Sequence, residues 1–237
     1  MCAGIVIGSM TPDQGAGGGS KPTPALHCLI VKPIPFVIAK ELIQRNHYLH
    51  SLPGGTMLCF GTFSGERLLG ALTLGAGPYQ AYCLVDGAAR SDCLVLTRLW
   101  LSDELPWNSE SRVIGIVTRL IRRHTDVKFL ISYADPSAGH VGGIYQSAGW
   151  LYTGLSSAMP LYDLGDGIAR HSRSVAHDYG SHSIQYLGDH GVMVKLVAQS
   201  AKHRYIKFLD ASWRCRLTAP VLPYPKKEVE QSEFENS

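Results

Sequence analysis

Apolar positions in the middle of the chain change their spacing several times and predict alternating strands and helices. Residues 94–101 form a mostly apolar run, which predicts a largely buried strand. From Ser111 apolar residues recur at three- and four-residue spacing with arginines between them, which predicts an amphipathic helix. Residues 129–134 predict a second buried strand, ended by Asp135 because the residue before a proline avoids helical backbone. Strand, helix and strand in this order predict a right-handed crossover with parallel strands.

Similar patterns extend in both directions along the chain. Pro35 suits the first turn of a helix that runs to about Tyr48. Alternation in residues 56–63 and 67–75, around Ser64 and Gly65, predicts an antiparallel hairpin. Further strands are predicted at residues 27–31, 151–153, 192–198 and 203–209. Residues 161–190 are rich in Gly, Asp, Ser and His, which favours a solvated loop over a metal-binding tract.

The carboxyl ends of the two parallel strands predict where a ligand binds. We expect Arg98, Asp135 and the amide groups of the helix start at 108–111 near one rim of the sheet. An arginine inside an apolar strand is costly to bury without an anionic partner. That partner is either Asp135 or a carboxylate or phosphate of a ligand.

Composition divides the chain into four expected parts. Residues 1–24 are rich in Gly, Ser and Pro and predict a flexible leader; 25–160 predict a catalytic core; 161–219 predict a basic extension packed on the core; and 220–237 predict a flexible tail. The leader's glycines follow no strand, so a phosphate-cradling loop is not expected there. No apolar run approaches the roughly 20 residues that span a bilayer, which predicts a cytoplasmic protein.

Charge and cysteine content add two expectations. The net charge of +3 is too small to indicate a nucleic-acid partner, but residues 170–216 hold eight Lys or Arg against three Asp. In that region KHRYIKFL alternates basic with apolar residues, which suits either a sheet face on a phosphate backbone or an ordinary half-exposed strand. Six scattered cysteines without a CxxC pair predict reduced, mostly buried thiols.

His47 and His50 stand at the end of the predicted first helix. Three residues apart, they can share a helix face and bind a metal. Alternatively they interact with the negative helix C-terminus, and this second interpretation is favoured because spacing locates no third ligand.

The segment IYQSAGW places Tyr145 four residues before a Gly-Trp pair and ahead of a strand. It resembles the end of the GCN5-related N-acetyltransferase fold, in which a tyrosine there protonates the leaving thiolate of coenzyme A. The resemblance implies an α/β fold with a mixed sheet, flanking helices and a C-terminal β-rich extension. It also implies acetyl-coenzyme A or another acyl donor, bound near the helix start at Asn108, Ser109, Ser111 and Arg112. The expected Gly-rich loop is replaced by ELPWNSES, whose Glu110 would repel a phosphate.

A second resemblance covers residues 34–225. HYLHSLPGG, LTRLWLSDELP, SYADPSAGH, IYQSAGWLYTGLS and KHRYIKFLD resemble blocks of the Mom DNA-modification family of phage Mu and its relatives. That family is an acetyltransferase-like offshoot that converts adenine in DNA to an N6-carbamoylmethyl derivative and so protects phage DNA from host restriction enzymes. The resemblance implies a transferase that acts in the bacterial host cytoplasm on double-stranded DNA, with a homodimer left open.

The Mom resemblance also implies site residues. His47, Tyr48, Arg98, Asp135 and Tyr145 match the residues implicated in the family's active site. The family is associated with iron, for which His47 and Asp135 offer two of the three ligands of a facial triad. The DNA contacts expected from the basic segments are Arg119, Arg122, Arg123, Lys202, Arg204 and Lys207.

The residue types suit modification of an adenine amine, which requires the base to be flipped out and held between flat side chains. Candidate stacking surfaces are Tyr48, Trp100, Tyr133 and Trp150. Asp135 either accepts the N6 proton and orients the amine or only caps a turn. Tyr145 either protonates a leaving group or is a half-buried core aromatic. Competing functions are an N-acetyltransferase for a small amine or protein and a non-enzymatic DNA-binding phage accessory protein.

Overall fold

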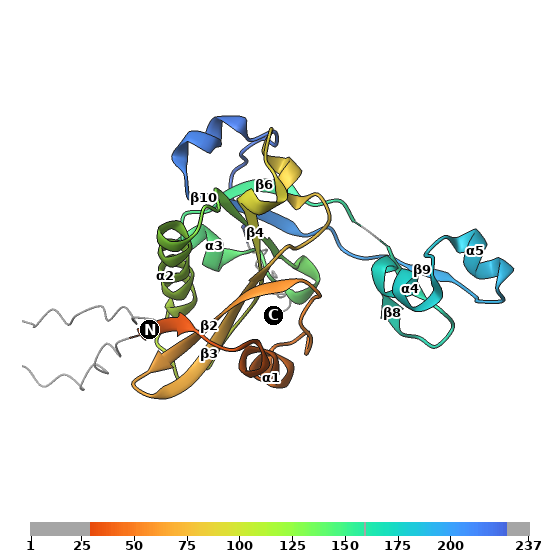
Figure 1. The fold of residues 1–237 in the computed structure, drawn as a ribbon, viewed down its shortest axis with the longest axis horizontal. Coiled ribbons are helices and arrows are strands. Elements are labelled where there is room, and N and C mark those ends of the chain that lie inside the picture. Colours follow the sequence, from red (N-terminus) through yellow and green to blue (C-terminus); the bar gives the residue numbers. More distant parts are fainter. Residues whose placement is uncertain (1–28, 159, 227–237) are drawn as a thin grey trace, which may run out of the picture. The chain divides into compact units, whose positions relative to one another are not determined.

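Seven strands of the protein form one mixed sheet (Figure 1). The computed structural model describes residues 29–158 and 160–226. The sheet order is β1-β2-β3-β4-β5-β10-β6. The strands are β1 (Leu29–Pro33), β2 (Thr56–Ser64), β3 (Arg67–Gly75), β4 (Cys93–Leu101), β5 (Phe129–Ala134), β6 (Leu151–Leu155) and β10 (His203–Phe208). The predicted α/β class with a mixed sheet is therefore confirmed.

The pairing of the strands follows the predicted crossover. β1 to β4 are antiparallel neighbours, whereas β4 and β5 pair in parallel from Cys93 opposite Phe129 to Leu96 opposite Ser132. The hairpin of β2 and β3 turns at Gly65, whose φ of 59° is in the left-handed region that a turn residue needs. Parallel pairing ends at Leu96 and Ser132, although β4 continues to Leu101.

The helices pack on the sheet with the apolar faces that their sequences predict. α1 (Phe36–Asn46) packs Ala39 and Ile43 against Cys59 and Ala71 of the hairpin. α2 (Ser109–His124) buries the residues at helical spacing, and it lies beside α3 (Gly143–Ser147) (Figure 1). The buried side chains of α2 are Ser109, Val113, Ile114, Val117 and Ile121. The short 3₁₀ helices are η1 (Ala81–Leu84), η2 (Arg90–Asp92), η3 (Pro136–Ala138) and η4 (Ala211–Arg216).

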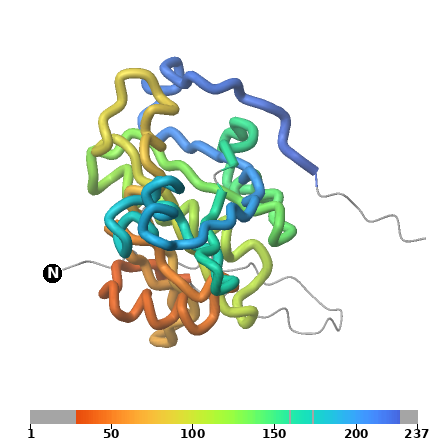
Figure 2. The backbone as a smooth tube through the Cα atoms, turned by 90° about the vertical axis from the view of Figure 1, so that its right-hand side faces the viewer, coloured from red at the N-terminus to blue at the C-terminus, as the bar shows by residue number. Residues whose placement is uncertain are grey.

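The chain forms two units that are interleaved along the sequence. The first consists of residues up to Tyr133, Gly142–Thr153 and Tyr205–Tyr224; the second consists of Ala134–Val141, Gly154–Arg204 and the residues from Pro225. Figure 2 shows the backbone coloured by residue number, so the path of the chain can be followed from α3 onward. The predicted leader and most of the predicted tail lie outside the described residues, and the predicted boundaries at 160 and 219 stay predictions.

The second unit has a small sheet and two helices of its own. β7 (Leu161–Asp163) pairs with β8 (Ala169–Arg170) and with β9 (Lys195–Val197), both antiparallel. Tyr162, Val175 and Leu187 form its core. The loop predicted at residues 161–190 is wrong, since this stretch contains α4 (Ser172–Tyr179) and α5 (Ile184–Asp189). So few apolar residues anchor these helices that no helical period is visible in the sequence.

Two smaller expectations can be compared with the structure. The strand predicted at residues 203–209 is β10, which lies between β5 and β6; Tyr205 and Ile206 are fully buried and the other four residues are half-buried, so both interpretations of this strand stay predictions. Among the described cysteines, Cys59 and Cys93 are buried but Cys83 and Cys215 are exposed, and all four are free thiols. In the part of the chain that the structure describes, no helix is long and apolar enough to cross a membrane.

Candidate functional site

Arg98 is positioned by an irregularity in β4. Thr73 lies opposite Arg98 and Leu74 opposite Leu96, so Thr97 is an extra residue that forms a bulge. The Thr97 hydroxyl hydrogen-bonds the hydroxyl of Thr73 at 2.9 Å. The Arg98 side chain donates from Nε to the Ser51 carbonyl at 2.8 Å and from Nη1 to the Thr97 carbonyl at 2.7 Å. The bulge therefore turns Arg98 toward the loop that follows α1.

Burial also shapes the electrostatics of Arg98. It lowers the pKa of the guanidinium, while the nearby Tyr48 hydroxyl acts in the opposite direction. Asp135 forms an ion pair with Lys202. The predicted convergence of Arg98 and Asp135 at one rim stays a prediction, because the two residues belong to different units.

His47 and Tyr48 lie just beyond α1. The His47 side chain is buried, and the backbone of this residue is extended. The Nδ1 atom of His47 accepts a hydrogen bond from the Leu49 amide at 3.1 Å. Its ring stacks on Tyr48 with a centroid separation of 4.5 Å, and Tyr48 is 51% exposed. His50 contacts the Gln44 carbonyl of α1 through Nδ1 at 2.9 Å. Because α1 ends at Asn46, the two histidines share no helix face, and the helix-end interpretation is supported for His50.

Tyr145 is enclosed by aromatic rings. Its ring centroid lies 5.3 Å from that of Trp150 and 5.4 Å from that of Tyr205. Burial raises the pKa of Tyr145 to about 12, and a hydrogen bond with the Ser132 side chain only partly offsets this rise. Ser132 itself donates to the Leu96 carbonyl at 3.1 Å, at the last paired position of β4 and β5. Tyr145 is therefore a neutral hydroxyl held where the parallel strands stop pairing.

These residues form one neighbourhood in the first unit. Tyr48 stacks on His47 and is electrostatically coupled to both Arg98 and Tyr145. The structure thus brings together His47, Tyr48, Arg98 and Tyr145, which approach from the loop after α1, from β4 and from α3.

Asp135 follows β5 and belongs to the second unit. Its Oδ1 accepts hydrogen bonds from the Ser137 amide at 3.0 Å, the Ser137 hydroxyl at 2.6 Å and the Ser200 hydroxyl at 3.0 Å. Its Oδ2 lies 3.2 Å from Lys202 Nζ. Burial by itself raises the pKa of Asp135, but the hydrogen bonds from Ser137 and Ser200 and the charge of Lys202 outweigh it, so the pKa is lowered. Asp135 caps η3 as the turn interpretation predicted, and it is ionised at neutral pH.

The residues predicted to hold a coenzyme A pyrophosphate fit that group poorly. The hydroxyl of Ser109 donates to the Pro106 carbonyl at 2.6 Å, and that of Ser111 donates to the Asn108 carbonyl at 3.0 Å. Both donors are thus used within the chain, and Glu110 places a negative charge in the first turn of α2. Asn108 has a φ of 64°, and Arg112 is exposed one turn later.

The six predicted DNA contacts differ in their surroundings. Arg119, Arg122 and Arg123 are exposed on α2 and extend away from its buried face. Lys207 Nζ donates to the Ala148 and Gly149 carbonyls at 3.2 and 3.0 Å, and Lys202 pairs with Asp135. Arg204 is half-buried on β10. The arginines of α2 are therefore the predicted contacts that are most open to a ligand.

Comparison with known proteins agrees with the sequence blocks. The model of the Mom protein family matches residues 28–226. The methylcarbamoylase Mom of Escherichia phage Mu is 32% identical over 210 residues, which cover 84% of each chain. The chain belongs to the Mom protein family. The matched range includes every residue predicted for the site, from His47 to Lys207.

Solved structures similar to this Mom family member include two acetyltransferases. NAA60 of Arabidopsis thaliana, in complex with acetyl-CoA, has a TM-score of 0.46 and 10% identity over 76% of this chain and 98% of that one. The IAA acetyltransferase of Bacillus cereus has a TM-score of 0.43 and 11% identity over 76% of this chain and 99% of that one.

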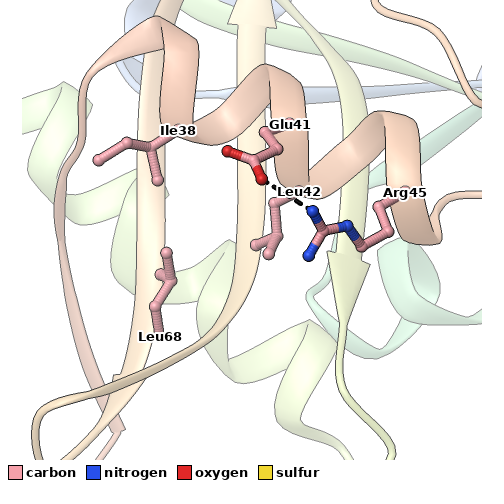
Figure 3. Close-up of a pocket in the computed structure, with 5 residues that line it drawn as sticks. All are labelled: Ile38, Glu41, Leu42, Arg45 and Leu68. Atoms are coloured by element: carbon pink, nitrogen blue, oxygen red, sulfur yellow. Dashed lines mark hydrogen bonds and ion pairs between the residues drawn. The ribbon is translucent and has the colours of Figure 1, made fainter.

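The expected metal site and the cavities of the protein are the last features to consider. Within residues 29–158 and 160–226, no group of three or more His, Cys, Asp or Glu side chains is placed to hold a metal ion, so the iron site at His47 and Asp135 is not supported. A pocket of about 180 Å³ lies between α1 and β3 (Figure 3). It is lined by Ile38, Glu41, Leu42, Arg45 and Leu68, none of which is a predicted site residue, and it is smaller than ordinary ligand pockets.

Sequence reasoning missed several partners of the site residues in this Mom family member. Ser132 bonds Tyr145, Ser51 receives Arg98, and Ser200 holds Asp135. Serines carry no signal of such contacts in a single sequence. The bulge at Thr97 had a weak signal, because two polar residues interrupt an apolar strand there.

Proposed function

We propose that this Mom family member transfers a carbamoylmethyl group to N6 of adenine in double-stranded DNA and thereby protects phage DNA from restriction. The observation that carries the proposal is the 32% identity to the methylcarbamoylase of phage Mu across 84% of both chains. The described side chains supply groups of the right type for that reaction, as follows.

The target base must leave the stack before its amine can react. A flipped adenine needs a flat, accessible surface, and Tyr48 offers one because its ring is about half exposed (51%) and backed by His47. Trp150 does not, since it is fully buried. Among the predicted stacking residues, Tyr48 is therefore assigned to the base.

Proton transfer is assigned to Tyr145. In the reaction the N6–carbon bond forms, the bond from that carbon to the leaving group breaks, and the proton that N6 loses passes to water. A leaving group departs more easily when it is protonated, and Tyr145 holds a proton at neutral pH, since its pKa of about 12 lies far above 7.

Orientation of the amine is assigned to Asp135. A carboxylate with a lowered pKa is a weak base but a good hydrogen-bond acceptor. Asp135 therefore aligns the N6 amine and stabilises the positive charge that develops on nitrogen as the new bond forms. Its Oδ1 is surrounded by three donors, whereas Lys202 is the one partner of Oδ2 among residues 29–158 and 160–226, so Oδ2 keeps acceptor capacity.

The donor is proposed to carry its leaving group on the methylene carbon of the carbamoylmethyl group, because the new bond joins N6 to that carbon. Direct transfer from an acyl thioester would form an amide at N6 instead. Binding of a coenzyme A pyrophosphate at the start of α2 is not part of the proposal, because the hydroxyls of Ser109 and Ser111 are already bonded and Glu110 opposes it.

The test is the state of adenine in DNA from cells that express the protein. Nucleoside mass spectrometry should detect the modified adenine, and the DNA should resist restriction enzymes that cut at adenine-containing sites. Tyr145→Phe and Asp135→Asn should each lower modification by about 100-fold or more. Unmodified adenine beside well-expressed, folded wild-type protein would contradict the proposal. Turnover of acetyl-coenzyme A on small amines would favour the N-acetyltransferase alternative.

A further inference from the structure

We propose that Lys202 and Ser200 are positioning residues that fix the Asp135 carboxylate for the reaction, and that Lys202 does not act as a DNA phosphate contact. This inference rests on the proposed function for the role of Asp135. It changes the role that the basic pattern of residues 202–209 suggested for Lys202.

The contacts of Asp135 come from two separate stretches of the chain. Ser137, two residues away, donates to Oδ1 with both its amide and its hydroxyl, which any turn-capping aspartate can achieve. Ser200 donates to the same oxygen at 3.0 Å across 65 residues of sequence, and Lys202 Nζ lies 3.2 Å from Oδ2. A turn cap needs neither of these distant partners. They fix both oxygens of the carboxylate.

The backbone of Lys202 is itself fixed. Its amide donates to the Ser156 hydroxyl at 3.0 Å, and its carbonyl accepts from the Ser156 amide at 2.8 Å. Ser156 thus bonds both backbone polar groups of Lys202. Such reciprocal bonds limit the movement of the lysine to its side-chain torsions, which favours a defined contact at Asp135.

Burial separates Lys202 from an ordinary surface lysine. The side chains of Lys202 and Asp135 are 28% and 13% exposed, whereas the surface pair of Arg67 and Glu104 is 68% and 55% exposed. Exposed pairs contribute little, but an opposite charge beside a largely buried carboxylate strongly favours its ionised form. Removing Lys202 should therefore raise the pKa of Asp135.

Two roles for Lys202 predict different measurements. A lysine that contacts phosphate contributes to the salt dependence of DNA binding, with a slope of about one per contact in a plot of log affinity against log salt. A lysine that positions Asp135 leaves this slope unchanged and alters the titration of Asp135 and the extent of modification.

The experiment compares full-length wild type with Lys202→Met, Lys202→Arg and Ser156→Ala. Lys195→Met is the matched control, because Lys195 is exposed on β9 of the same unit and the charge change is identical. The carboxyl carbon of Asp135 is titrated by NMR and identified with Asp135→Asn. Adenine modification in expressing cells and DNA affinity at several salt concentrations are measured in parallel.

We expect Lys202→Met to move the Asp135 titration to higher pH and to lower modification by about tenfold or more, the effect of losing one favourable charge beside a carboxylate. Lys202→Arg should restore most of the modification, and the salt slope should match that of Lys195→Met. Ser156→Ala should shift the titration in the same direction by a smaller amount. If Lys202→Met fails to fold, Ser156→Ala and Ser200→Ala provide the same test.

Other outcomes separate the two proposals. An unchanged Asp135 titration, or a salt slope reduced by about one in Lys202→Met, would overturn the positioning role. If wild type modifies no DNA while the titration still shifts in Lys202→Met, the proposed function fails and the Lys202–Asp135 coupling stands. If wild type modifies DNA but Lys202→Met modifies it equally well, the proposed function stands and this inference fails.

Discussion

Tyr145 is almost fully buried, yet its hydroxyl bonds the Ser132 side chain. A buried phenol hydroxyl needs a hydrogen-bond partner, and Ser132 supplies it at the end of the parallel strand pair. The combination of burial and a hydrogen bond keeps the phenol neutral and oriented. At the scale of single residues, this is the feature that supports the proton donation proposed for Tyr145.

Burial of Tyr145 predicts how stability changes at alkaline pH. The pKa of Tyr145 is about 12 in the folded protein and about 10 in the unfolded chain. The contribution of the neutral hydroxyl to the free energy of unfolding is therefore fully present below pH 10 and is lost as the pH rises toward 12. The free energy of unfolding of wild type should therefore fall through this window. In Tyr145→Phe the fall should be shallower, as measured by urea denaturation at several pH values. Equal slopes in the two proteins would contradict the burial of an ionisable group at this position.

At the scale of elements, α3 depends on a close approach between glycine and an aromatic ring. Gly142 has a φ of 80°, and a Cβ atom there would lie 2.4 Å from the Tyr205 ring. Tyr205 in turn packs on Tyr145 and accepts a hydrogen bond from Gln146 Nε2 at 3.0 Å. The start of α3 therefore sets the position of the ring that packs on Tyr145.

Gly142→Ala should destabilise the protein by at least about 2 kcal/mol, because it combines a left-handed backbone with a clash against the ring. Gly143→Ala is the matched control, since nothing lies within 4 Å of its Cβ position and residue 143 begins α3. It should be neutral or stabilise the protein by up to about 1 kcal/mol. Thermal denaturation of both variants measures the difference, and equal stabilities would contradict the packing of Tyr205 over Gly142.

The exposed face of α2 makes a separate prediction about DNA. Replacing Arg119, Arg122 and Arg123 together by Ala should weaken binding to duplex DNA and reduce the salt slope by about one for each lost phosphate contact. Arg67→Ala is a suitable control, because Arg67 is also exposed but is paired with Glu104. Fluorescence anisotropy at several salt concentrations measures both quantities. A slope unchanged in the triple variant would remove α2 from the DNA surface.

The elements most accurately predicted are those in which apolar residues recur at a regular spacing over many positions. The hairpin of β2 and β3, the helix α2 and strand β5 follow from alternation, helical period and the proline after Asp135. The bulge at Thr97 depends on the register of two strands, which no single strand encodes. The contact of Ser200 with Asp135 spans 65 residues and involves a residue type common in loops, so no local pattern indicates it. The family resemblance proposes which residues form the site, whereas their hydrogen-bond partners are visible only in the three-dimensional structure.

At the scale of the whole molecule, the two units differ in the size of their cores. The second unit has a cluster of three buried residues, Tyr162, Val175 and Leu187, and strands of two or three residues. The first unit has a seven-stranded sheet covered by helices. Less buried apolar area means a lower free energy of local opening.

Hydrogen exchange should reveal this difference. The amides of α4 and α5 should exchange at least about tenfold faster than those of β3, β4 and β5, when followed by mass spectrometry under native conditions. Such a result would place the contacts of Asp135 with Ser200 and Lys202 in the part of the protein that opens first. Equal protection across both units would contradict the inference from core size.

The place of β10 in the sheet has a consequence for synthesis on the ribosome. This strand, residues 203–208, lies between β5 and β6, which precede it by some fifty or more residues. Until β10 has emerged from the ribosomal tunnel, β5 has an open edge and β6 has no neighbour to pair with. A nascent chain stopped before residue 203 therefore lacks an interior strand of its own sheet, and we expect no activity from such a fragment. The complete sheet can thus form only after residue 208 has left the tunnel.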